Sequence, residues 1–155
     1  MKQHERAALG SKAEGGAEQR QHLVYGPVPS RRLGRSLGVN AVPMKVCTYA
    51  CVYCQLGPTI SMTVDRSEFF DPDAVVKEVG RRIAQLRDTG ESCDYVTFVA
   101  NGEPTLDVNL GSEIAAVREL GVNVAVITNG SLLWREDVRR DLMAADWVLK
   151  TRKRA

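Results

Sequence analysis

The feature that most restricts the fold of this chain is a regular alternation of amphipathic helical segments with short apolar segments. Residues 94–100, 122–128 and 146–150 are rich in apolar, β-branched or aromatic side chains and are typical of buried strands. An earlier strand is expected at about 37–46, so that three helices connect four strands. This alternation favours an α/β architecture with a parallel sheet and right-handed crossovers.

Three helices are expected between these strands. The first follows Asp71, a good N-cap, and ends at Gly90. Its apolar side chains recur at steps of four, four and three residues, which predicts one buried stripe: Val75, Val79, Ile83 and Leu86. A second helix is expected from a Ser112 cap to Gly121, and a third over roughly 134–145.

The segments before the first helix are harder to interpret. Gly, Pro and Ser punctuate residues 26–41, which predicts a loop leading into the strand at 37–46. Pro43 has no N–H group, so this strand is expected at the edge of the sheet. Residues 1–22 contain almost no large apolar side chains, and we expect them to form a disordered arm. Residues 23–155 would then form the core domain.

Composition and charge exclude several classes of protein. The 155 residues carry 21 Lys and Arg against 19 Asp and Glu, so a net charge of +2 gives no argument for nucleic-acid binding. No apolar run reaches the about 18 residues that a membrane span needs, and the N-terminus has no secretory apolar region. We therefore expect a cytoplasmic protein without a membrane partner, in which clustered cysteines indicate metal binding or catalysis rather than disulfides.

Unusual residues follow three of the expected strands. A cysteine-rich loop, CTYACVYCQLGPT, follows the first strand, and NGEPT (101–105) follows the second. The sequence TNGS (128–131) ends the third. Because the carboxyl ends of parallel strands lie at one edge of a sheet, we expect these three loops to meet around one site.

The cysteine loop carries the strongest chemical signal. Cys47, Cys51 and Cys54 have the spacing C-x3-C-x2-C, and thiolates this close can turn toward zinc or an iron–sulfur cluster. A structural zinc site usually has paired knuckles and a fourth Cys or His, and chance clustering of buried cysteines also stays open. The remaining cysteine, Cys93, should lie roughly 23 Å from the far end of its strand. We expect it to be a small buried hydrophobic residue, which would leave one iron of a cluster without a protein ligand.

These motifs resemble a known family. CTYACVYC, with Tyr53 before the third cysteine, resembles the signature of the radical S-adenosylmethionine (radical SAM) superfamily. NGEPT resembles the Gly-Gly-Glu-Pro motif of that superfamily, and GPVPSRRLGRSLGVN resembles the lead-in of a bacterial and archaeal branch loosely related to wybutosine-type tRNA-modifying enzymes. The resemblance covers about residues 25–149. It implies a parallel partial (βα) barrel, truncated after about the fourth strand, where this chain ends in TRKRA and the family continues.

The resemblance also implies a cofactor and a reaction. Cys47, Cys51 and Cys54 would hold three irons of a [4Fe-4S] cluster, and the fourth iron would bind S-adenosylmethionine. An electron from a flavodoxin- or ferredoxin-type donor would cleave S-adenosylmethionine and yield a 5′-deoxyadenosyl radical, which abstracts hydrogen from an unknown substrate. RNA is one substrate class that this resemblance allows. The alternative is a truncated, non-catalytic fragment that binds an iron–sulfur cluster or zinc.

The resemblance assigns cofactor binding to one aromatic residue and two loops: Tyr53, Asn101, Gly102, Glu103, Pro104, Thr128 and Asn129. Tyr53 would lie near the adenine, and the backbone of 101–104 would bind the methionine amino group. Asn101 replaces the first glycine of the motif, and asparagine tolerates the positive φ that such a turn can need. Thr128 and Asn129 would contact the cofactor or a substrate, or else form a strand-end turn.

Two further features stay open. The Glu103 carboxylate offers an acceptor for an ammonium group, or is a solvated loop carboxylate. The three arginines before the expected first strand could bind a phosphate or an acidic substrate, but such side chains more often pair with carboxylates or face solvent: Arg31, Arg32 and Arg35.

Overall fold

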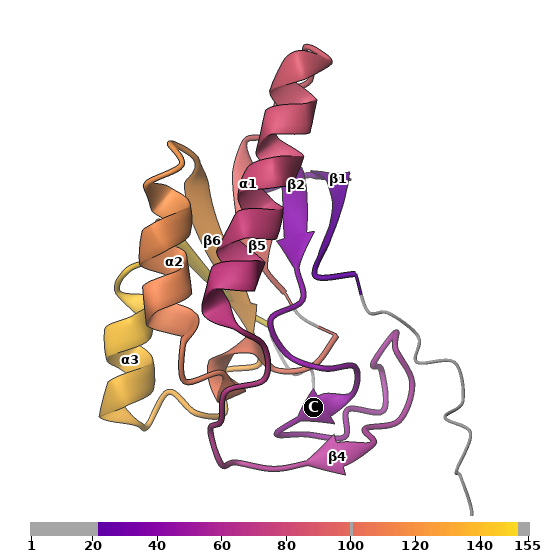
Figure 1. Ribbon diagram of the computed structural model, residues 1–155. Coiled ribbons are helices and arrows are strands. Elements are labelled where there is room, and N and C mark those ends of the chain that lie inside the picture. Colours follow the sequence, from indigo (N-terminus) through magenta and orange to yellow (C-terminus); the bar gives the residue numbers. More distant parts are fainter. Residues whose placement is uncertain (1–21, 100, 152–155) are drawn as a thin grey trace, which may run out of the picture.

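The computed structural model describes residues 22–99 and 101–151, and Figure 1 shows their α/β arrangement. A five-stranded sheet has the order β1-β2-β5-β6-β7. Its strands are β1 (Val24–Ser30), β2 (Gly34–Val39), β5 (Tyr95–Phe98), β6 (Asn123–Thr128) and β7 (Trp147–Lys150). Strand β1 is antiparallel to β2, while β2, β5, β6 and β7 run parallel. The α/β class is confirmed, and the sheet is mixed rather than wholly parallel.

Helices connect the parallel strands in sequence order. They are α1 (Pro72–Asp88), α2 (Leu110–Arg118) and α3 (Glu136–Leu142), and a short 3-10 helix, η1 (Pro104–Leu106), precedes α2. Figure 1 shows α1, α2 and α3 in front of the sheet, on the same face. None of the helices in the described part of the chain is long and apolar enough to cross a membrane.

A second, smaller sheet lies beyond the ends of the main strands. It pairs β3 (Val46–Cys47) with β4 (Ser61–Met62) in parallel. In Figure 1 the arrowheads of β2 and β6 point toward the bottom of the view, where this small sheet lies. The cysteine loop therefore lies at the edge of the main sheet where its parallel strands end.

The core forms between the sheet and the three helices. Alternate side chains of β2, β5 and β6 face the helices and are fully buried: Leu37, Val39, Val96, Phe98, Val124 and Val126. The helices contribute their own apolar stripes to this cluster, including Val79 and Ile114. Burying one such side chain contributes roughly 1.5–3 kcal/mol, so this layer supplies most of the driving force for the fold.

Helix α1 follows the expectation from sequence closely. The Asp71 side chain accepts a hydrogen bond from the backbone N–H of Asp73, and the expected stripe is buried: Val75, Val79, Ile83 and Leu86. Helix α2 differs, because it begins at Leu110 and Ser112 is not its N-cap. The Asp107 carboxylate accepts the backbone N–H of Asn109 at 2.8 Å, which starts the turn earlier. The Ser112 hydroxyl lies within the helix and donates to the carbonyl of Asn109.

The expectation for the first strands is wrong in two respects. Residues that were expected to form a loop build β1, and the strand expected at 37–46 is β2, which ends at Val39. Strand β2 lies between β1 and β5 rather than at the edge, and Pro43 falls in the connection after it. Pro27 and Pro29 are tolerated because β1 is the edge strand and needs no N–H donors on its outer side. The expected arm, apart from His22, lies outside the described residues.

The opposite face of the sheet carries small and polar side chains. Ser36 and Thr97 point to this face, with their hydroxyl oxygens 2.5 Å apart. The ring of Tyr25 lies over Gly38, where a Cβ atom would collide with it. Together with Ile127, these residues line an open pocket of about 210 Å³. No helix among the described residues covers this face (Figure 1).

Candidate functional site

The three loops that were expected to meet do meet at the carboxyl edge of the sheet. Backbone hydrogen bonds join the cysteine segment to the NGEPT loop: the N–H of Lys45 donates to the carbonyl of Asn101 at 2.8 Å, and the N–H of Glu103 donates to Val46 at 3.1 Å. A Cβ atom on Gly102 would collide with the carbonyl of Val46. Glycine is therefore required at this position by the close approach of two protein segments.

Asn101 does not use the conformation that was expected for it. Among the described residues, Lys45 is the one non-glycine residue with a positive φ, at 67°. The NGEPT loop therefore turns without a positive φ at Asn101. A side chain in this region of φ costs of order 1–3 kcal/mol, and it persists only when surrounding contacts enforce it.

Glu103 connects the NGEPT loop to the end of β6. The residue is only 2% exposed, so it is not a solvated loop carboxylate. One oxygen accepts hydrogen bonds from the hydroxyls of Thr105 and Thr128, at 2.6 and 2.5 Å, and from the backbone N–H of Thr105. The other oxygen accepts the backbone N–H of Asn129 at 2.8 Å. These four donors satisfy the hydrogen-bonding capacity of the carboxylate within the protein. Glu103 therefore holds the NGEPT loop and the end of β6 together.

Asn129 extends this network to the cysteine segment. Its side-chain amide donates to the hydroxyl of Thr48 at 2.8 Å and lies 3.7 Å from the sulfur of Cys47. The hydroxyl of Ser131 contacts the same Thr48 oxygen at 2.6 Å. Thr48 is buried and its two partners are half-buried, so these bonds are only partly accessible to water. Sequence reasoning identified Asn129 but missed Thr48 and Ser131. Thr48 directly follows Cys47 and Ser131 ends the TNGS sequence, and these positions could have indicated that both belong to the site.

Lys45 is the third residue that sequence reasoning missed. It is 6% exposed, and its ammonium group donates to the carbonyl of Gly57 and lies 3.9 Å from the sulfur of Cys54. Its own carbonyl accepts the backbone N–H groups of Ile60 and Ser61. Its place two residues before the first cysteine of the motif could have indicated that Lys45 belongs to the site.

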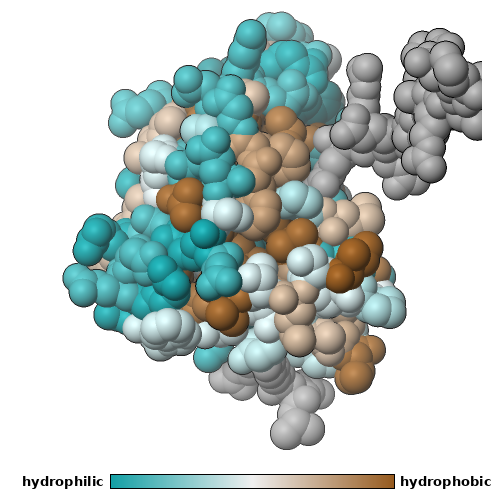
Figure 2. All heavy atoms as spheres, turned by 60° about the horizontal axis from the view of Figure 1, so that its bottom comes forward, coloured by the Kyte–Doolittle hydropathy of each residue, from teal (hydrophilic) through white to brown (hydrophobic). Residues whose placement is uncertain are grey.

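The cysteine loop itself is only partly covered. Cys47, Cys51 and Cys54 are half-buried free thiols. The side chain of Tyr53 is 55% exposed, and desolvation together with a hydrogen bond to Cys51 raises the pKa of its hydroxyl. Figure 2 views the molecule from the bottom of Figure 1 and shows hydrophobic spheres among polar ones on that face. Exposed apolar residues of the cysteine segment include Val52, Leu56, Ile60 and Met62.

The donor set of this loop suits an iron–sulfur cluster. Thiolates are the ligands that such clusters use, and hydrogen bonds to the sulfurs tune them. N–H donors lie near two of the three sulfurs, from Asn129 at Cys47 and from Lys45 at Cys54. In the described part of the chain, no three His, Cys, Asp or Glu side chains are close enough together to form a ready-made metal site. The three cysteines thus lie on one loop at one edge of the main sheet, and they would have to turn toward one another to bind a cluster.

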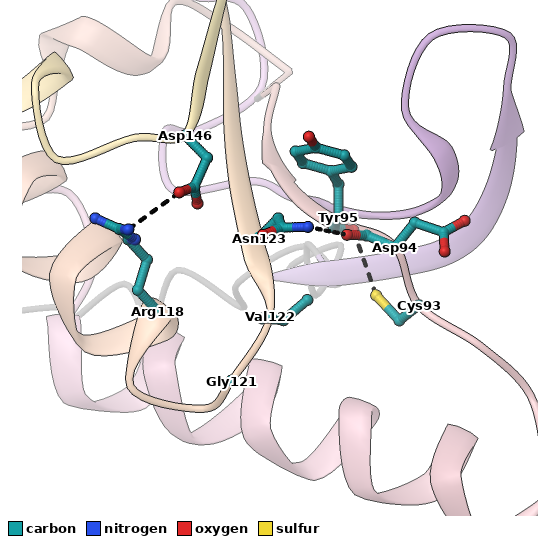
Figure 3. A pocket seen from close by; sticks show the side chains of 8 residues that line it. All are labelled: Cys93, Asp94, Tyr95, Arg118, Gly121, Val122, Asn123 and Asp146. Atoms are coloured by element: carbon teal, nitrogen blue, oxygen red, sulfur yellow. Dashed lines mark hydrogen bonds and ion pairs between the residues drawn. The ribbon is translucent and has the colours of Figure 1, made fainter.

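Cys93 lies at the other end of the sheet. It precedes β5 and lines a polar pocket at the amino ends of β5 and β6, together with Asp94, Arg118 and Asp146 (Figure 3). Its thiol donates to the carbonyl of Tyr95 at 3.3 Å, and burial raises the pKa of that thiol. It packs against the core but is half-buried rather than fully buried. The expected separation of Cys93 from the other three cysteines is confirmed.

The three arginines lie away from the NGEPT and TNGS loops. Arg31 and Arg32 are exposed in the turn between β1 and β2. Arg35 forms an ion pair with Glu91, and both side chains are about half exposed. Its backbone N–H donates to the Asp94 carboxylate at 2.7 Å. These contacts agree with the simpler of the two expectations, in which the arginines pair with carboxylates or face solvent.

Comparison with known families agrees with this fold and site. The model of the radical SAM superfamily matches residues 41–148, a range that contains the cysteine loop, NGEPT and TNGS. The chain therefore belongs to the radical SAM superfamily.

Several curated proteins are similar to this chain over most of its length. A UPF0026 protein of Methanocaldococcus jannaschii is 53% identical over 126 residues, which cover 81% of this chain and 39% of that protein. A UPF0026 protein of Synechocystis is 40% identical over 127 residues, covering 81% and 46%. A protein named GTPase Obg, of Brachyspira hyodysenteriae, is 38% identical over 127 residues, covering 81% and 18%. The chain thus spans less than half the length of each of these relatives.

Proposed function

We propose that this chain binds a [4Fe-4S] cluster through Cys47, Cys51 and Cys54, and S-adenosylmethionine at the iron that these cysteines leave open. When bound, the cluster and S-adenosylmethionine supply the radical chemistry typical of the superfamily, driven by an electron from a flavodoxin- or ferredoxin-type donor. The role of the protein is to hold the cysteine loop, to position S-adenosylmethionine and to shield the reacting groups.

One observation carries this proposal. The cysteine segment is bonded both to the NGEPT loop, through Lys45 and Asn101, and to the end of β6, through Thr48 and Asn129. Glu103 in turn joins these two strand ends. Three segments that are distant in the sequence thus form one hydrogen-bonded edge. This is the arrangement expected of a binding site at the carboxyl ends of parallel strands.

For the cofactor itself, we propose the following contacts. The backbone of Asn101, Gly102 and Pro104 would receive the methionine part of S-adenosylmethionine, while Glu103 holds the loop in shape through its buried carboxylate. The exposed ring of Tyr53 would lie against the adenine. Thr128 and Asn129 would border the cofactor from the end of β6, with Asn129 also donating toward Cys47.

We further propose that the sheet is the first part of a larger barrel. The parallel strands β2, β5, β6 and β7 follow one another in sequence order, and α1–α3 cover one face (Figure 1). A barrel has this arrangement, whereas a doubly wound sheet reverses its strand order and carries helices on both faces. The uncovered face carries small side chains at Ser36 and Thr97 and has an open pocket of about 210 Å³, which would lie inside a barrel. The longer relatives are consistent with further units.

The first test measures cluster assembly in the wild type, in a variant of a proposed ligand, Cys51, and in a control variant of Cys93. Anaerobic reconstitution with iron and sulfide is expected to give a brown protein with broad visible absorbance. Substituting Cys51→Ala should abolish that absorbance and the bound iron, because it removes one of the three thiolate ligands. Substituting Cys93→Ala should leave both unchanged, since this thiol lies at the other end of the sheet. Equal iron binding by both variants would reject the proposed ligands.

The second test concerns S-adenosylmethionine. Adding it to the reduced, reconstituted protein should change the EPR spectrum of the cluster, and strong reductant should yield 5′-deoxyadenosine. A coloured protein that neither responds to S-adenosylmethionine nor cleaves it would be a non-catalytic iron–sulfur fragment. A colourless protein that binds about one zinc per chain would be a structural zinc protein instead.

A further inference from the structure

Lys45 occupies an unusual position before the cysteine loop. Its backbone has a positive φ of 67°, a conformation that lysine rarely adopts. Its N–H donates to the carbonyl of Asn101 at 2.8 Å, and its carbonyl accepts N–H groups from Ile60 and Ser61, both at 3.1 Å. The backbone of this one residue therefore joins the NGEPT loop to the far side of the cysteine segment.

The turn at Lys45 also directs its side chain inward. The residue is 6% exposed, and its ammonium group reaches the carbonyl of Gly57 and the sulfur of Cys54, the latter at 3.9 Å. Gly57 has a positive φ of 81° and closes the loop after Cys54, with its N–H bonded to the Cys54 carbonyl at 2.9 Å. The ammonium thus holds both the third cysteine and the turn that follows it.

This buried cation has no carboxylate partner in the described structure. None of the ion pairs among residues 22–99 and 101–151 includes Lys45. Burying a charge without a counter-charge is costly. A group that can carry a negative charge lies 3.9 Å from the ammonium: the Cys54 sulfur, which is a thiolate when it binds a metal. The lysine is therefore matched to a negatively charged group at the cysteine loop.

We propose that Lys45 is a positioning residue that holds Cys54 and places a fixed positive charge beside the cluster, which raises the reduction potential of the cluster. The inference rests on the proposed function, because it requires a cluster on the three cysteines. Reduction adds one electron to the cluster, and a nearby cation stabilises the more negative, reduced state. Lys45 takes no part in bond making or breaking.

The test compares the reduction potential of four reconstituted proteins by redox titration: wild type, Lys45→Gln, Lys45→Arg and Lys77→Gln. Lys45→Gln keeps a donor for the Gly57 carbonyl but loses the charge, so its potential should shift to a more negative value. Lys45→Arg keeps the charge and should stay near wild type. Lys77 is exposed on α1. Lys77→Gln also removes one positive charge, but at a site outside the cysteine loop, so the reduction potential of the cluster should not change.

Iron content provides the second readout. If Lys45→Gln loses iron while Lys45→Arg retains it, the charge is needed to hold Cys54, which supports the inference. Equal loss of iron from both variants would reject it, as would a Lys45→Gln protein with full iron and an unchanged potential. A wild-type chain that holds no cluster would instead reject the proposed function, and with it this inference. The two failures are therefore distinguishable.

Discussion

The hydroxyl of Thr128 donates to the buried carboxylate of Glu103 at 2.5 Å, which joins the end of β6 to the loop that follows β5. The same carboxylate accepts the backbone N–H of Asn129. The two strand ends are thereby fixed relative to each other by protein contacts. Glu103 thus has a structural role, the joining of two strand ends, that the resemblance of NGEPT to a cofactor-binding motif did not indicate.

Replacing Glu103 by glutamine should destabilise the protein. The amide would turn an NH₂ group toward donors that now face a carboxylate oxygen, leaving buried donors unpaired at about 1–3 kcal/mol. The free energy of unfolding, measured in urea, should fall by this order. Glu119→Gln serves as the control, because Glu119 is exposed at the end of α2. Equal stability of the two variants would contradict the assigned role.

Replacing Thr48 by valine should loosen the cysteine segment. The shape is preserved, but the oxygen that contacts the Asn129 amide and the Ser131 hydroxyl is lost. We expect a loss of about 1–3 kcal/mol in stability and faster amide exchange around the cysteines. Thr63→Val is the matched control, since its hydroxyl accepts a local bond from Asp65 two residues away. Unchanged exchange in Thr48→Val would rule out this connection.

Arg66 ties the segment after β4 to η1 and α3. Its guanidinium donates to the carbonyls of Thr105 and Asp107 and pairs with the Asp141 carboxylate, while its side chain is 5% exposed. Arg66→Leu leaves these acceptors without their donor and should cost about 2–4 kcal/mol on urea unfolding. Arg140→Leu removes an exposed pair with Glu136 and should cost little. A comparable loss in both variants would show that the interior pairing is unimportant.

Glu113 should make stability depend on pH. Both of its carboxylate oxygens are buried without a hydrogen-bond partner in the described structure. Burial, and then the charge of Asp107, raise the pKa of Glu113 to about 8. The unfolded chain releases this proton near pH 4.3. The folded state therefore binds more protons between about pH 4.5 and 8, and the free energy of unfolding should fall as the pH rises through this window.

Glu113→Gln tests that dependence, because glutamine has no proton to release. Its stability should fall less steeply between pH 5 and 8 than that of the wild type. A residual slope is expected because burial also raises the pKa of Asp107, to about 6. Glu119→Gln should keep the slope of the wild type. If Glu113→Gln follows the wild-type curve, the buried carboxyl is not the group responsible.

The helices and the parallel strands could be predicted because local patterns determine them. The cap at Asp71 and the stripe from Val75 to Leu86 require no knowledge of partners, and the apolar runs that form β5, β6 and β7 are equally local. Strand β1 could not be predicted in this way. Its prolines indicate a loop, and only pairing with β2 makes it an edge strand.

In the candidate site, too, the local motifs could be predicted from the sequence, whereas the contacts between distant segments could not. The cysteines and the NGEPT and TNGS loops are visible as motifs, and parallel topology predicts that they share one edge of the sheet. The turn at Lys45 and the satisfied carboxylate of Glu103 depend on contacts between distant segments. No spacing rule signals a lysine with a positive φ or a motif glutamate that bonds to another strand. The connections between the loops were therefore missed, although the loops themselves were identified.

The sequence-ordered arrangement of the sheet has a consequence for synthesis on the ribosome. The contacts described above between the cysteine segment and the strand ends involve residues from Lys45 to Ser131. Chains emerge from the ribosome N-terminus first, and folding can begin before synthesis ends. None of these contacts uses a residue of α3 or β7, so they do not depend on the emergence of these two elements. A nascent chain can therefore assemble the edge that carries its cysteine loop before α3 and β7 have left the ribosome.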